Sequence, residues 1–132
     1  MKILITQIHC YASIAITKLL KNKSTLGVEI WRCNRRTIGY VSGSLLVDTY
    51  ISIPNIHETN YTDYIKEIYK GNQIDFIISV DEEELLVFGQ NNLSKDCKLV
   101  IPAEKTLKLF MNKLEASLKI SELGIKILPI LF

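Results

Sequence analysis

Short apolar segments rich in β-branched residues alternate along this chain with longer segments of helical periodicity. The segments that we expect to be strands are 3–5, 28–33, 47–53, 73–80 and 98–101. The intervening helical segments are 11–23, 60–71, 82–93 and 103–123, the last with a break near Met111-Asn112. Because parallel strands need a crossover connection, usually a helix, this alternation predicts a mostly parallel sheet of about five strands with helices on both faces.

The pattern continues without a linker, an internal repeat or a low-complexity tract. We therefore expect one Rossmann-like, three-layer α/β/α domain over residues 1–124, with the N-terminal strand in a central position. Gly124 is a typical helix stop, so residues 125–132 are interpreted as an exit segment.

The composition of the chain argues against several classes of function. The chain has 132 residues and a net charge of +2, which is too small to indicate nucleic acid or an anionic membrane as a partner. No apolar run approaches the roughly 20 residues that span a bilayer, and the first residues lack a signal-peptide core. Three cysteines without motif spacing fit reduced thiols. These features favour a cytoplasmic protein.

The first strand is followed by a turn that contains no glycine, Gln7-Ile8-His9. A dinucleotide site needs glycines there and an acidic residue after the second strand, where this chain has Cys33-Asn34-Arg35-Arg36. The sequence therefore does not predict an NAD site. The next helix still offers free N–H groups to a carboxylate or phosphate near His9 to Ser13, although a plain connecting turn explains the same residues.

Polar residues follow the predicted strands where ligands bind in such sheets, outside the carboxyl ends. The residues that we expect to line a substrate cleft there are His9, Cys10, Ser13, Asn34, Glu82 and Glu84. The chain carries four acidic residues in a row, Asp81 to Glu84, where a helix is predicted to begin. The positive end of the helix dipole explains the negative charges of Glu82 and Glu83, but explains that of Glu84 less well.

Two other groups have a functional and a structural interpretation. His9, Cys10 and Cys33 are soft ligands that could hold zinc, but no fourth ligand has suitable spacing, so we predict no metal site. Arg35-Arg36 could clamp an anionic group, although a charge pair in a loop is more often only solvated.

The ordered set of local patterns resembles the N-terminal, pre-ATP-grasp domain of ATP-grasp ligases of the carbamoyl-phosphate-synthase large-subunit-like group. The matching stretches are KILIT, DTYISIP, IDFIISVDEEEL and KLVIPAEKTLKLFMNKLEASLKISELGIKILP. Together they extend over essentially the whole chain.

The resemblance assigns roles to single residues. Glu84 matches an acidic position after the fourth strand, and Glu82 the acidic residue two places before it. Lys113 matches a basic residue that in relatives reaches nucleotide phosphates bound by the next domain. Asn112 stands where relatives usually carry Asp, and Gln7-Ile8-His9 where they often have glycine or small residues.

The resemblance implies a substrate-side domain of a ligase that activates a small carboxylate as an acyl phosphate and passes it to an amine or similar nucleophile. ATP and Mg²⁺ would be bound mainly by an ATP-grasp domain beyond residue 132, so this chain alone would be inactive. We expect it to be a fragment of such a ligase, with residues 125–132 leading to that domain.

Two alternatives remain open from the residues. One is a stand-alone, non-catalytic Rossmann-like binding or regulatory module; a receiver domain fits poorly, because it needs acidic residues after its first strand. The other is assembly, because a surface that a missing domain would cover favours self-association, for instance as a homodimer.

Overall fold

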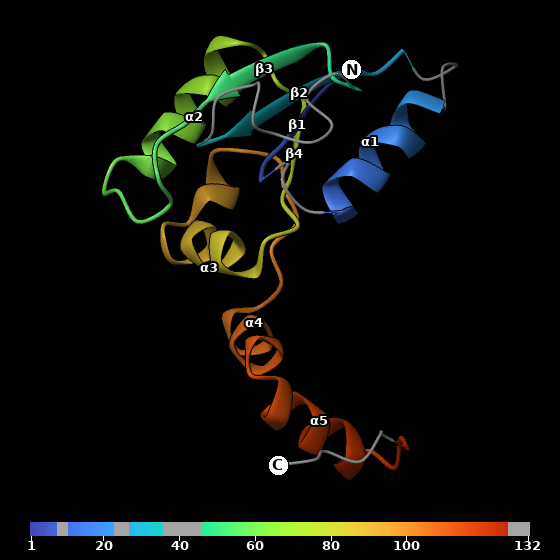
Figure 1. The fold of residues 1–132 in the computed structure, drawn as a ribbon. Helices are drawn as coiled ribbons and strands as arrows, with labels where there is room; N and C mark the ends of the chain where they lie inside the picture. The colour runs from blue at the N-terminus through green and yellow to red at the C-terminus, as the bar shows by residue number, and fades with distance from the viewer. Residues whose placement is uncertain (8–10, 23–26, 36–45, 127–132) are drawn as a thin grey trace. The chain divides into compact units, whose positions relative to one another are not determined.

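A computed structural model describes residues 1–7, 11–22, 27–35 and 46–126 (Figure 1). His9, Cys10 and Arg36 lie outside these residues. The chain forms two compact units, Met1–Ile101 and Pro102–Phe132. The helices of the second unit bury few side chains, among them Leu107 and Ala116. The domain over residues 1–124 and the exit segment 125–132 stay a prediction.

The described part of the first unit is built on four parallel strands (Figure 1). They are β1 (Lys2–Ile5), β2 (Glu29–Asn34), β3 (Thr49–Ser52) and β4 (Phe76–Ile78), in the order β3-β2-β1-β4. Leu4 of β1 lies beside Trp31 on one side and Ile77 on the other. The predicted α/β class and the central N-terminal strand are confirmed.

The segment that we expected to be a fifth strand is reduced to one parallel bridge, between Leu99 and Ile77. The Ile77 N–H donates to the Lys98 carbonyl at 2.9 Å. Val100 is 75% exposed and Pro102 follows closely, so little apolar burial supports a longer pairing.

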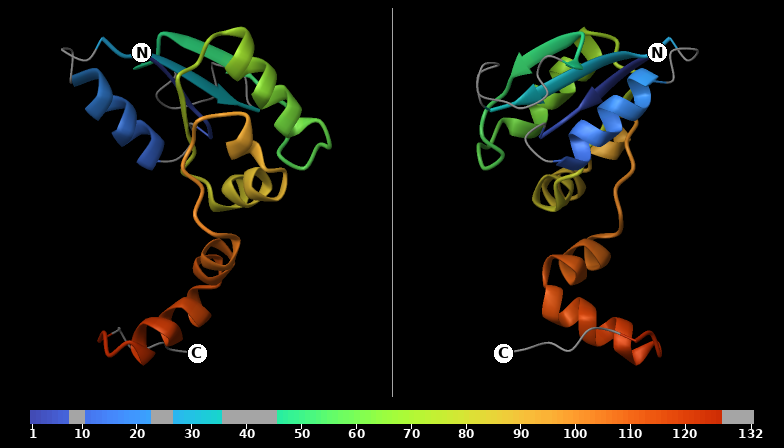
Figure 2. Two further views of the ribbon diagram at one scale, coloured as in Figure 1. Left: turned by 180° about the vertical axis from the view of Figure 1, so that it is seen from behind. Right: turned by 45° about the vertical axis from the view of Figure 1, so that its right-hand side comes forward.

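Helices cover both faces of the sheet, as Figure 2 shows. On one face, α1 (Tyr11–Asn22) packs against side chains that alternate along the strands, Ile3, Ile5 and Ile30. On the other, α2 (Tyr61–Gly71) and α3 (Glu82–Gln90) bury Tyr61, Ile65 and Phe88 against the opposite set. A short 3₁₀ helix, η4 (Leu93–Lys95), follows α3. This confirms the three-layer arrangement.

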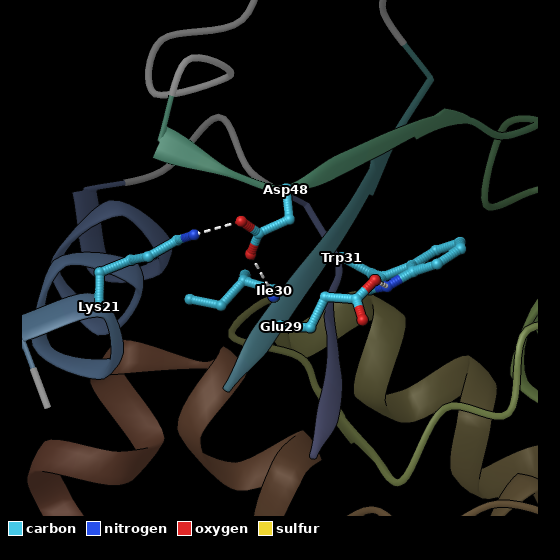
Figure 3. A network of polar contacts seen from close by, with 5 residues as sticks. All are labelled: Lys21, Glu29, Ile30, Trp31 and Asp48. Carbon is cyan, nitrogen blue, oxygen red and sulfur yellow. Dashed lines mark hydrogen bonds and ion pairs between the residues drawn. The ribbon is translucent and has the colours of Figure 1, made fainter. Parts of the chain in front are cut away.

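Asp48 ties the start of β3 to its neighbours (Figure 3). Its carboxylate accepts a hydrogen bond from Lys21 of α1 at 2.5 Å and one from the Ile30 N–H of β2 at 2.7 Å. Although partial burial opposes the change, these donors lower the pKa of Asp48. At the same end of this pair of strands, the Trp31 side chain donates to Glu29 at 2.6 Å.

The second unit contains α4 (Glu104–Met111) and α5 (Lys113–Glu122). They are separated at Asn112, near the predicted break, because its extended backbone ends one helix and its side chain caps the next by accepting the Glu115 N–H at 3.2 Å. Gly124 follows α5 with a φ of +78°, which favours glycine. Within the described ranges, the helices are too short or too polar to cross a membrane.

Candidate functional site at the carboxyl ends of the strands

A buried carboxylate, Glu84, joins three separate parts of the first unit. Its two oxygens accept hydrogen bonds from the hydroxyl groups of Thr6, Tyr61 and Ser79. Thr6 follows β1, Tyr61 begins α2 and Ser79 follows β4. Glu84 itself lies in the first turn of α3 and is 0% exposed. Glu84, the acidic residue that the helix dipole explains least well, thus connects the ends of β1 and β4 with the first turns of α2 and α3.

Burial shifts the pKa values of Glu84 and of the side chains around it. It raises the pKa of Glu84, whereas the three hydroxyl donors act in the opposite direction without cancelling the effect. Burial and the nearby charge of Glu84 also raise the pKa of Tyr61. The buried Cys33 thiol has its pKa raised by the same two causes. The Tyr61 hydroxyl therefore remains a hydrogen-bond donor at neutral pH.

The raised pKa of Glu84 predicts a pH dependence of stability. A carboxyl group with a higher pKa in the folded state contributes stability below its unfolded pKa, and that contribution is lost as the pH rises through the folded pKa. From about pH 4.3 upward, the free energy of unfolding should fall more for the wild-type chain than for Glu84→Gln. Urea unfolding at successive pH values tests this; parallel curves for the two proteins would contradict it.

The segment that follows each described strand contributes to a cavity of about 230 Å³. It is lined by Gln7, Arg35, Pro54, Asn55, Ile56, His57, Asp81 and Glu83. We call it the strand-end cleft. Its place, outside the carboxyl ends of parallel strands, is the general ligand position in such sheets.

The walls of the strand-end cleft are held by local hydrogen bonds. The Asn55 side chain accepts the His57 N–H at 3.2 Å, and the Asn55 N–H donates to Glu58 at 2.8 Å. Asp81 caps α3 by accepting the Glu84 N–H at 2.9 Å. Gln7 has a φ of +50°, which is uncommon for a residue with a side chain. These contacts set the backbone of the loops after β1, β3 and β4.

The cleft carries charges of both signs. Arg35 is exposed at the end of β2. Asp81 and Glu83 lie on the wall formed by the start of α3, and the His57 ring lies 3.7 Å from the Glu83 carboxylate. A guanidinium opposite carboxylates suits a small ligand that itself carries both an anionic and a cationic group.

Of the residues predicted from the sequence, those that the structure describes are absent from the lining of the strand-end cleft. Ser13, Asn34 and Glu84 are buried, and Glu82 is exposed at the start of α3, between the lining residues Asp81 and Glu83. Lys113 is exposed in the second unit. His9 and Cys10 fall outside the described residues. In the described ranges, no group of three His, Cys, Asp or Glu residues is placed to hold a metal ion.

The site prediction did not include several residues that line the cleft. The sequence contains an indication for some of them. Gln7, Arg35 and Asn55 each follow a predicted strand and belong to the same class of position as the residues that we chose. His57 has no such signal, because it lies in a loop of irregular structure whose course the sequence does not indicate.

A family model shows the family of this chain, and solved structures show its fold. The family model described as PylC-like, N-terminal domain matches residues 3–100, nearly the extent of the first unit. A comparison with curated protein sequences gave no match.

Among solved structures, the chain is similar to glycinamide-RNase-transformylase T from Mycobacterium tuberculosis, with 12% identity and a TM-score of 0.61. It is also similar to an L-amino acid ligase from Bacillus licheniformis (12%, 0.58) and to the biotin carboxylase domain of a thermophilic 2-oxoglutarate carboxylase (14%, 0.59). These alignments cover 98%, 95% and 97% of this chain but 37%, 30% and 28% of the other chains.

Proposed function

The chain belongs to the family of PylC-like N-terminal domains, which are N-terminal domains of ATP-grasp enzymes, and on this premise we propose that it is the substrate-side domain of a carboxylate–amine ligase. The observation that supports this proposal most is the strand-end cleft, because the segment that follows each of the four described strands contributes a residue to it. The membership of the carbamoyl-phosphate-synthase-like group remains part of the proposal.

The charged residues of the cleft support a substrate that carries both a carboxylate and an ammonium group. Arg35 would hold the carboxylate of the substrate, and Asp81 and Glu83 would hold an ammonium group. The smallest molecule with both groups is an amino acid, and a similar solved structure is described as an L-amino acid ligase. A carboxylate without an amine would meet two acidic side chains without compensation.

The residues around the cleft have supporting roles in this proposal. The three hydroxyl groups bound by Glu84 would keep the loops after β1 and β4 in position. Glu82, together with His9 and Cys10 outside the described residues, would line the approach to the cleft. Ser13 and Asn34, which are both buried, would help to hold α1 and the end of β2 in position.

ATP and Mg²⁺ would be bound by a second, ATP-grasp domain of the same polypeptide, with Lys113 reaching toward the phosphates. This fits the lengths of the similar structures, of which this chain spans little more than a third at most. On its own, the chain would bind substrate without completing the reaction.

The 132-residue chain alone should bind neither NAD nor magnesium-ATP with micromolar affinity. Lys113 is exposed, and an exposed ion pair contributes at most about 1 kcal/mol, against the roughly 8 kcal/mol of micromolar binding. Calorimetric titration with each nucleotide tests this. Micromolar binding of NAD would contradict the interpretation of the glycine-free turn, and micromolar binding of ATP would show that the nucleotide site lies within this chain.

Amide chemical shifts of the isotope-labelled chain, titrated with glycine and separately with acetate, test the substrate class. We expect glycine to shift the Gln7, Asn55 and Asp81 amides and to bind more tightly than acetate, because only glycine matches both signs of charge. If acetate binds as tightly, the acidic wall does not hold an amine. If neither ligand shifts these amides, the strand-end cleft is not the substrate site.

A further inference from the structure

A second cavity, of about 390 Å³, adjoins the strand-end cleft. It is lined by Ile56, His57, Glu58, Thr59, Tyr61, Thr62, Val87 and Asn91, and we call it the helix-side cavity. Ile56 and His57 line both cavities, so these two residues form a common wall between them. A ligand in one cavity can therefore extend into the other past this wall.

The helix-side cavity differs chemically from the strand-end cleft. Apolar side chains from three elements meet in it, namely Ile56, Tyr61 and Val87, and its other walls include the neutral Thr59, Thr62 and Asn91. The carboxylate of Glu58 is engaged by the Asn55 N–H at 2.8 Å. The common wall thus separates a charged cavity from a mostly uncharged one.

Thr62 places a hydroxyl group among the walls of this cavity. The residue is 5% exposed and lies in the first turn of α2. A hydroxyl group can both donate and accept a hydrogen bond. A polar atom of a ligand in the cavity can therefore bond to Thr62, while the apolar part of the ligand contacts Ile56, Tyr61 and Val87.

We propose that the helix-side cavity is a subsite for the uncharged side chain of the amino acid whose charged groups occupy the strand-end cleft. This inference rests on the proposed function and adds the substrate class to it: an amino acid with an uncharged side chain, preferably one that ends in a hydrogen-bonding group such as an amide. Thr62 is the specificity-determining residue for that group.

A series of amino acids with straight side chains tests the subsite: glycine, alanine, 2-aminobutyrate, norvaline and norleucine, each titrated into the labelled chain. Each methylene that enters the helix-side cavity should tighten binding by up to about fourfold. The longer members should also shift the Thr62 and Val87 amides, which glycine leaves unchanged.

Matched variants at the C-terminal end of α3, at its last residue Gln90 and at the following Asn91, distinguish binding in the cavity from nonspecific hydrophobic binding. Asn91 lines the cavity, whereas the adjacent Gln90 is exposed and lines neither cavity. Asn91→Trp should fill the cavity and abolish the gain with chain length, while Gln90→Trp should keep it. Thr62→Val should weaken glutamine binding about fivefold and leave norleucine binding unchanged.

The outcomes distinguish this inference from the proposed function. If glycine shifts the amides of the strand-end cleft but longer side chains bring no gain, the subsite is wrong and the substrate cleft stands. A chain-length gain that survives in Asn91→Trp also overturns the subsite. If none of the amino acids shifts either set of amides, both proposals are contradicted.

Discussion

Replacing Glu84 with alanine is expected to lower the free energy of unfolding by about 3 kcal/mol or more, since a buried hydroxyl group that loses its partner costs roughly 1 kcal/mol or more. The hydroxyl groups of Thr6, Tyr61 and Ser79 donate to this carboxylate, and the first two residues are buried. The cavity left by the side chain adds to the loss. Urea unfolding monitored by circular dichroism measures the change.

Glu82→Ala is the matched control, because Glu82 lies in the same helical turn but is exposed. It removes only a favourable interaction with the helix dipole, so the loss should stay below about 1 kcal/mol. If the two variants were equally stable, the hydrogen bonds of Glu84 would not be what joins α2 and α3 to the ends of the strands.

Arg35→Ala is expected to weaken glycine binding to the chain by about tenfold or more, because hydrogen bonds to charged groups contribute roughly 1.5 kcal/mol or more. The guanidinium is the only described cation along the strand-end cleft whose charge does not depend on pH. Titration of the variant, followed by the Asn55 and Asp81 amides, measures the loss.

Arg35→Lys keeps the positive charge but removes the planar pair of donors, so its affinity for glycine should lie between those of wild type and Arg35→Ala. The stability of the chain should be unchanged in both variants, because Arg35 is exposed. Glycine binding that is insensitive to both substitutions would exclude Arg35 from the substrate site.

Much of the fold could be predicted from local patterns. The doubly apolar segment Ile3-Leu4-Ile5 predicts a strand covered on both faces, and in the structure its side chains are divided between two buried clusters. The break at Asn112 could also be predicted, because asparagine caps helices well. The fifth strand was not confirmed beyond one bridge, since composition alone does not show whether a neighbour will bury a segment.

The candidate site was less accessible to prediction. Which edge of the sheet carries it follows from the parallel topology, but which side chains reach the surface there does not. Thr6, Tyr61 and Ser79 are far apart in sequence, and only the fold brings them to Glu84. Glu84, which we predicted to line the cleft, is buried. His57, which lies in an irregular loop, lines the cleft instead.

The central claim is that this chain presents a carboxylate for activation by ATP. The most direct test is to incubate the product of the complete gene with magnesium-ATP, hydroxylamine and a panel of amino acids, and to measure hydroxamate and ADP. Hydroxylamine captures an acyl phosphate, so we predict hydroxamate that requires the amino acid and decreases at least tenfold in Arg35→Ala. Amino acid binding without hydroxamate or ADP from any member of the panel would contradict the ligase and favour a stand-alone binding module.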